Sequence, residues 1–335
     1  PQVRESIAQH YDNIHYMDGQ VGEIVANLQA DGLLNSTVVI WTTDHGDGLP
    51  RAKRAVYDTG LHVPLVLRWP DKTGAGQLDT RLVSVVDLAP SILQLAGIEV
   101  PAFVQGQAML NTVVTRDYVF AGRDRMDAIL DHVRAARDQR YKYIRNYQAD
   151  LSYFRPLAFR DMFPVMQALW QAKAAGTLTE QQGFYFTAPR PLEELYDTAI
   201  DPQELVNLAS EPEHAQSLQR LRGAMDNWIR RVGDKGVIDE SLMIEAMWPG
   251  GQQPSTQAPT IETRDQQLIL TSATPGASIA YRLEAAGFGA ELFGNHDAWQ
   301  LYTQPLDLQT LSGATLVAKA VRYGYAESAE SSASY

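Results

Sequence analysis

The first hundred residues alternate between one long helical pattern and short apolar runs, and this alternation restricts the chain to layered α/β folds. Apolar residues recur at steps of three and four over 7–28, which predicts a long helix ending at 31–32. Residues 38–41 and 64–69 are continuous apolar runs, typical of parallel strands covered on both faces. We expect a third strand at 82–86.

The pattern changes beyond this region. Residues 118–120, 129–133 and 141–144 predict shorter strands joined by charged turns, and therefore an antiparallel sheet. Residues 161–175 and 213–232 carry helical spacing. We interpret this part of the chain as a second subdomain.

A third region follows the Pro- and Gly-rich stretch at 249–254, which we interpret as a linker. Three apolar runs beyond it, at 267–270, 278–282 and 316–321, predict a small all-β module. The expected division of the chain is an α/β part, an antiparallel subdomain with helices, and a linker with a β module, at 1–115, 116–248 and 249–335.

Charge and composition exclude several classes of partner. The formal net charge is −12, so the surface repels nucleic acid phosphates, and we expect no nucleic acid partner. The chain contains no cysteine, which rules out disulfides and thiolate metal sites. No uninterrupted apolar run reaches the roughly 18 residues of a membrane helix, so no membrane span is expected.

The segment after the first apolar run carries the candidate chemistry. Asp44 offers a hard oxygen and His45 an imidazole nitrogen, both suited to a divalent cation. Gly46 and Gly48 allow a sharp turn close to a ligand, and Lys53 adds a compact cation. Two adjacent ligands do not complete a metal site, and a turn with a capping Asp is the structural alternative.

Ordered motifs along residues 11–208 resemble type I sulfatases of the alkaline-phosphatase-like superfamily. The matching segments are a helix, a strand with its metal-ligand turn, a lysine-to-strand stretch, a later helix and a C-terminal subdomain, at 16–22, 37–46, 53–64, 86–101 and 194–208. The resemblance implies the C-terminal part of an alkaline-phosphatase-like α/β sandwich, with a small antiparallel subdomain and an appended β module.

The resemblance also implies roles for individual residues. Asp44 and His45 match two ligands of a Ca²⁺ or Mg²⁺ ion, and Lys53 matches the lysine that contacts the sulfate and the nucleophile. His62 falls where many members carry a substrate-facing Arg or His, with a capping role as the alternative. Arg51 is a candidate cleft cation, although a solvated position would also suit it.

One part of the family pattern is missing. The family nucleophile is a formylglycine made from Cys or Ser in a Cys/Ser-x-Pro-x-Arg motif, and no such motif occurs in this sequence. We therefore expect the chain to be the C-terminal part of a longer sulfatase and to be inactive by itself. By the same resemblance we expect a periplasmic or secreted protein.

The expected substrate is a sulfated saccharide. Residues 44–51 look most like heparan N-sulfatase-like and bacterial polysaccharide sulfatases, and the terminal module resembles the C-terminal β module of some β-hexosaminidases. Arg123 and Asp124, expected at a strand end, are candidate sugar contacts. Ordinary surface charge is the alternative for both.

Two other functions remain open at this stage. A phosphatase or phosphodiesterase of the same superfamily would also use an Asp-His pair, usually with a further downstream histidine; His132, His214 and His296 lie downstream without a family-like setting. A non-catalytic carbohydrate-binding protein is the second alternative.

Overall fold

The structure is a computed structural model of the 335-residue chain and describes residues 2–110, 115–285 and 298–335. The chain divides into two compact units, Pro1–Gly236 and Val237–Tyr335, each with its own core. Within the described ranges, none of the helices combines the length and apolar character that crossing a membrane requires.

The first unit begins with the predicted long helix, α1 (Gln2–Ala30), which ends where Gly32 adopts a φ of 73°. The strands β1 (Val39–Thr42) and β2 (Leu65–Arg68) confirm that the next two apolar runs form strands, but the two strands pair antiparallel. The parallel prediction was wrong, since the chain returns beside β1 through a loop and a short helix. The pair is also only partly covered: Val66 in β2 is exposed.

The third predicted strand, at 82–86, is wrong as well. The segment is extended only as far as Ser84 and then turns into the 3₁₀ helix η1 (Val85–Asp87) and the helix α3 (Leu88–Leu95). The buried Asp87 carboxylate explains the turn, because it accepts hydrogen bonds of 2.8 Å from the backbone nitrogens of both Ser84 and Gln107.

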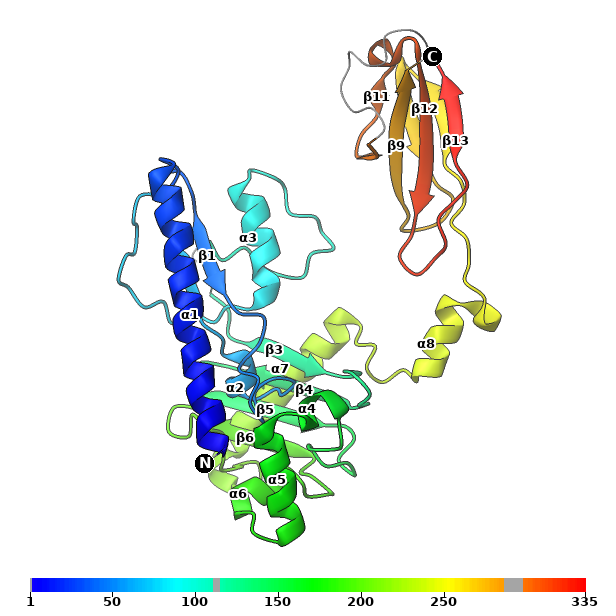
Figure 1. Cartoon of the computed structure of the whole chain (residues 1–335). Helices are drawn as coiled ribbons and strands as arrows, with labels where there is room; N and C mark the ends of the chain where they lie inside the picture. The colour runs from blue at the N-terminus through cyan, green and yellow to red at the C-terminus, as the bar shows by residue number, and fades with distance from the viewer. Residues whose placement is uncertain (1, 111–114, 286–297) are drawn as a thin grey trace. The chain divides into compact units, whose positions relative to one another are not determined.

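The predicted antiparallel sheet is confirmed in the second half of this unit (Figure 1). Its strands are hydrogen-bonded in chain order, namely β3 (Val119–Arg123), β4 (Val133–Arg137), β5 (Tyr141–Asn146) and β6 (Glu193–Asp197). The second strand begins at Val133, where the predicted one ended. The helices of this region are α4 (Ala158–Asp161), α5 (Pro164–Ala175), α6 (Glu180–Phe184), η2 (Pro212–His214) and α7 (Ala215–Val232).

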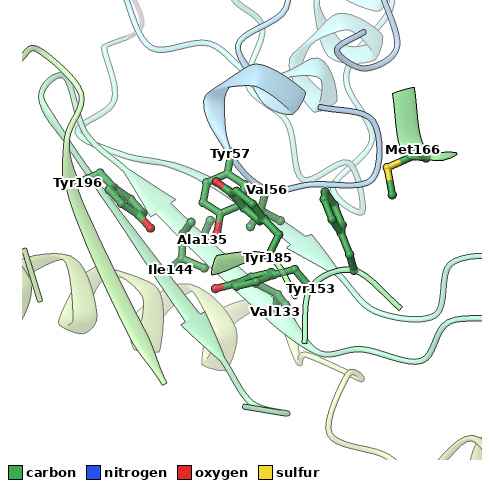
Figure 2. Packing of buried hydrophobic residues seen from close by; sticks show 10 residues of the cluster. Val56, Tyr57, Val133, Ala135, Ile144, Tyr153, Met166, Tyr185 and Tyr196 are labelled. Atoms are coloured by element: carbon green, nitrogen blue, oxygen red, sulfur yellow. The ribbon is translucent and has the colours of Figure 1, made fainter. Parts of the chain in front are cut away.

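The two faces of this sheet bury different cores, because successive strand residues point to opposite sides. Ala136, Tyr143 and Leu195 lie on one face and pack under α7. On the opposite face, Ala135 and Ile144 belong to one core cluster with several tyrosines and with Met166 of α5. Figure 2 shows Ala135 and Ile144 beside the tyrosine rings. The second face therefore supports the loop that precedes the short helix α2 (Asp58–Leu61).

The second unit contains the predicted all-β module. Helix α8 (Glu240–Met247) and the 3₁₀ turn η3 (Pro249–Gly251) come before it. One sheet contains β11 (Leu306–Asp307), β8 (Gln267–Thr271) and β7 (Thr260–Arg264); the other contains β10 (Gln300–Leu301), β9 (Ser278–Ala285), β12 (Ala314–Val321) and β13 (Ser331–Ser334). Leu268, Leu270, Leu316 and Ala318 contribute to the core of the module.

Candidate functional site

The candidate metal-ligand turn follows β1. The Asp44 carboxylate is 84% exposed, and its Oδ2 lies 3.4 Å from Nε2 of His45. Nδ1 of His45 lies 2.7 Å from the carbonyl oxygen of Gly46, which can only accept, so Nδ1 carries the proton. In a neutral ring Nε2 is then the nitrogen with the free lone pair, as a metal ligand requires.

These two donors fit part of a divalent cation site. An exposed oxygen and an adjacent lone-pair nitrogen can share one cation, and a Ca²⁺ or Mg²⁺ ion needs roughly six or more ligands. Among residues 2–110, 115–285 and 298–335, no cluster of three or more His, Cys, Asp or Glu side chains could hold a metal. Further ligands would have to come from backbone or other side-chain oxygens, from water or from groups outside the described residues.

The loop from this turn to α2 folds back on itself. The backbone nitrogen of Gly46 donates to the carbonyl oxygen of Gly60 over 3.0 Å. The backbone nitrogen of Lys53 donates to the carbonyl oxygen of Asp47, also over 3.0 Å. A Cβ atom at Gly46 would lie 1.9 Å from the Thr59 carbonyl oxygen, so the close backbone approach requires glycine. The same test at Gly48 finds open space.

Arg51 is held by Glu204, a residue far away in the sequence. Nη2 of Arg51 donates to the backbone oxygen of Glu204 over 2.8 Å, and the guanidinium lies 4.3 Å from the Tyr57 ring centroid and 5.5 Å from that of Tyr185. The Glu204 carboxylate accepts from the Asp58 nitrogen over 2.6 Å. Glu204 therefore holds both ends of the 51–58 segment.

A buried carboxylate organises the tyrosines beneath this segment. Glu194 accepts hydrogen bonds from Tyr57 over 2.9 Å and from Tyr196 over 2.6 Å, and also from Tyr153. Burial, followed by the Glu194 charge, raises the pKa of Tyr57, and burial raises the pKa of Tyr185 to about 12. These rings stay neutral near pH 7 and form a fixed aromatic floor (Figure 2).

Three of these tyrosines, Tyr57, Tyr153 and Tyr185, line a cavity of about 30 Å³. Its charged lining is entirely basic in the part of the chain that the structure describes and consists of Arg51, Lys53, Arg54, Arg123 and Arg160. Nζ of Lys53 lies 5.9 Å from the Phe159 ring centroid. A small space lined by several cations is suited to an oxyanion.

The cavity contains Arg51, Lys53 and Arg123, three of the residues predicted to form the site. Asp44 and His45 are not part of its lining, although they belong to the same loop as Lys53. Asp124 lies outside it too and accepts from both terminal nitrogens of Arg134, over 2.7 and 2.9 Å.

His62 is also absent from the lining. It is exposed at the C-terminal end of α2, where its backbone nitrogen donates to the Asp58 carbonyl oxygen over 2.8 Å. The sequence analysis missed Arg160 and the buried tyrosines around Glu194. No local motif connects these residues with the Lys53 loop, because only the fold brings the segments together.

The downstream histidines occupy structural positions where the chain is described. His132 is buried, stacks on Tyr147 with ring centroids 4.0 Å apart, and has Nε2 3.8 Å from Oδ2 of Asp234. His214 ends η2, with Nδ1 3.4 Å from the Tyr141 hydroxyl. His296 lies outside the described residues. Neither described histidine lines the cavity.

The turn offers two donors suited to a cation, and the charged residues that line the cavity are basic. Comparison with known proteins adds the class of protein. The family model "Sulfatase" matches residues 2–98, and "N-sulphoglucosamine sulphohydrolase, C-terminal" matches residues 51–155. An ulvan-active sulfatase of Formosa agariphila is 38% identical over 96% of this chain and 54% of its own length. Human N-sulphoglucosamine sulphohydrolase is 28% identical over 72% of this chain and 52% of its own length.

The chain belongs to the sulfatase family. The described residues combine helices and sheets, as the predicted α/β fold class requires. A crystal structure of a candidate sulfatase from Bacteroides thetaiotaomicron is 24% identical, covers 65% of this chain and 41% of its own, and has a TM-score of 0.48. The chain spans about half the length of the curated relatives named above.

Proposed function

We propose that the protein containing this chain hydrolyses a sulfate ester or N-sulfate on a saccharide. The observation that carries the proposal is the Lys53 loop, which joins the Asp44–His45 turn to a cavity whose charged lining is basic. Family membership supports the same chemistry. The nucleophile, a formylglycine in this proposal, would come from a part of the protein outside this chain, since the sequence contains no Cys/Ser-x-Pro-x-Arg motif.

In the proposed mechanism the residues of this chain bind and neutralise the sulfuryl group. Asp44 and His45 would hold a Ca²⁺ or Mg²⁺ ion, which supplies Lewis-acid stabilisation of negative charge when bound. The Lys53 ammonium would face the sulfuryl oxygens and stabilise the charge that grows on them in the transition state. Arg51, fixed on Tyr57, lines the adjoining cavity and would keep a second positive charge near Lys53.

The proposed substrate is a sulfated saccharide. The named relatives include one described as ulvan-active and one described as an N-sulphoglucosamine sulphohydrolase, and both names refer to sulfated carbohydrates. The basic cavity beside aromatic side chains is compatible with such a substrate. A periplasmic or secreted location remains a prediction from the resemblance.

The test uses the full-length protein with the variants Lys53→Gln and Asp44→Asn and, as the control, Lys235→Gln at an exposed position. We expect turnover of an aryl sulfate to exceed that of the matching aryl phosphate. Lys53→Gln should lower kcat by about 10²- to 10³-fold, and EDTA should abolish activity until Ca²⁺ or Mg²⁺ is restored. A preference for phosphate would support the phosphatase alternative instead.

The carbohydrate-binding alternative makes a different prediction. A non-catalytic protein would bind glycans through this chain and would be indifferent to Lys53→Gln, and its full-length form would release no sulfate. That combination would reject the proposed hydrolysis.

A further inference from the structure

Asp131 is a buried carboxylate surrounded by three arginines. Arg190 donates hydrogen bonds to it from both terminal nitrogens. The Nη2 atoms of Arg155 and Arg123 lie 3.6 and 3.8 Å from Oδ2 of Asp131. The side chains of Asp131 and Arg190 are fully buried. Three guanidinium charges thus share this carboxylate, and Asp150 also acts on Arg155, so positive charge still exceeds negative charge in the cluster. Buried excess charge is costly unless an anion compensates it.

This excess charge borders the cavity, because Arg123 belongs both to the cluster and to the cavity lining. Arg160 also lines the cavity, and its Nη2 donates to the Arg155 backbone oxygen over 2.5 Å. Two lining residues do have acidic partners: Arg160 pairs with Asp161 at 3.3 Å, and Arg54 pairs with Asp127 at 2.5 Å.

Two donor atoms of the cluster nevertheless lack an acceptor. The Nε atoms of Arg123 and Arg155 are buried and have no hydrogen-bond acceptor among the described residues. Burial lowers the pKa of Arg123; the Asp131 charge opposes this, and the neighbouring arginines, Arg190 first, lower it further. Asp131 is therefore shared by several arginines, and the Nε donors of Arg123 and Arg155 remain without an acceptor.

We infer that the cavity binds a second anionic group of the substrate, a carboxylate or an additional sulfate on the saccharide, through Arg123 and Arg160. This inference rests on the proposed function, in which the Asp44–His45 turn holds the reacting sulfuryl group. That turn lies outside the cavity lining, so the two anions occupy different positions. Lys53, which lines the cavity and follows the turn in the same loop, connects them.

The dimensions of the cavity set what enters it. A volume of about 30 Å³ has room for one or two water-sized groups, and hence for a small charged group but not a sugar ring. Guanidinium groups match planar or tetrahedral oxyanions through paired N–H donors. The substrate class is therefore a saccharide with at least two anionic groups, one of which is not hydrolysed.

The test uses the complete 335-residue chain in EDTA, so that bound metal makes no contribution. Calorimetry would measure binding of glucuronate, inorganic sulfate and neutral glucose. We expect one or both oxyanions to bind and glucose not to bind. Arg123→Gln and Arg160→Gln should each lower the affinity for the anion by about tenfold or more. Arg145→Gln, a partly buried ion-paired arginine that does not line the cavity, is the matched control and should leave binding unchanged.

A second measurement needs no variant, in case a substitution unfolds the chain. Bound glucuronate or sulfate should protect Arg123 and Arg160 from phenylglyoxal, read by mass spectrometry, while exposed Arg231 reacts as before. Absence of protection would overturn the inference. So would equal binding of glucose, unchanged binding by folded Arg123→Gln and Arg160→Gln, or an equal loss in Arg145→Gln.

This result is separable from the proposed function, because anion binding requires no turnover. Anion binding that depends on Arg123, in a protein whose full-length form releases no sulfate, would reject the proposed hydrolysis alone. Sulfate release without such binding would reject the second anion position alone.

Discussion

Lys142 and Asp58 form a buried ion pair, with Nζ of the lysine 2.8 Å from Oδ1 of the aspartate. Lys142 also lies 3.2 Å from Oε1 of Glu204, and its side chain is 1% exposed. Asp58 begins α2, and Glu204 holds Arg51. The pair therefore connects β5 of the antiparallel sheet with the loop that carries Lys53.

Replacing Lys142 should be strongly destabilising. Lys142→Met leaves Asp58 and Glu204 without their shared cation, and removing one partner of a buried pair costs about 3–5 kcal/mol. Burial already raises the pKa of Glu204 even with Lys142 present. Chemical denaturation of the chain measures the effect, with exposed Lys235→Met as the control. A loss below about 1 kcal/mol would contradict the role assigned to this pair.

Two glycines in the ligand turn should respond differently to alanine. Gly46→Ala places a Cβ 1.9 Å from the Thr59 backbone oxygen, so the turn must shift, whereas Gly48→Ala meets no atom within 4 Å. Overpacking of this kind costs about 1–3 kcal/mol. We expect Gly46→Ala to lower the melting temperature and, in the full-length protein, the activity. Equal effects of the two substitutions would show that close approach is not the reason for glycine at position 46.

The Arg140–Asp197 pair predicts a pH dependence of stability. The hydrogen bond from Arg140 lowers the pKa of Asp197 below 3.8. A lowered carboxyl pKa stabilises the fold above the unfolded value, and this contribution is lost as the pH falls through the folded pKa. Urea midpoints of the chain and of Arg140→Gln should therefore differ at pH 6, and the difference should shrink as the pH falls below the usual Asp pKa. Arg231→Gln, at an exposed position, should have the same urea midpoint as the unsubstituted chain at pH 6. A difference that does not shrink as the pH is lowered from 6 would contradict the assignment.

Limited proteolysis should locate the boundary between the two units. The compact units meet at Gly236–Val237, whereas the composition of the sequence placed a linker at 249–254. We expect early cleavage between the end of α7 and the start of β7, and a C-terminal fragment that keeps the core around Leu268 and Leu316. Mass spectrometry identifies the cut. Early cleavage within β9 or β12 would count against an independently stable module.

The regular elements were largely predictable from the sequence because each depends on local periodicity. The long helix α1, the short apolar strands and the alternating strands of the second sheet all repeat at spacings that a single segment displays. Pairing partners are not local. This is why the direction of β1 against β2 and the turn at Ser84–Asp87, formed through contacts with the distant Gln107, were predicted incorrectly.

For the candidate site, the sequence alone identified residue types that form a motif within one loop, namely Asp44, His45, Arg51 and Lys53. It also identified Arg123, but not what Arg123 contacts. Only the tertiary structure assembled the basic cavity, the tyrosines around Glu194 and the arginines around Asp131. Their charges interact across long sequence separations, and Coulomb energy and desolvation depend on distance and burial in space, which no local pattern encodes.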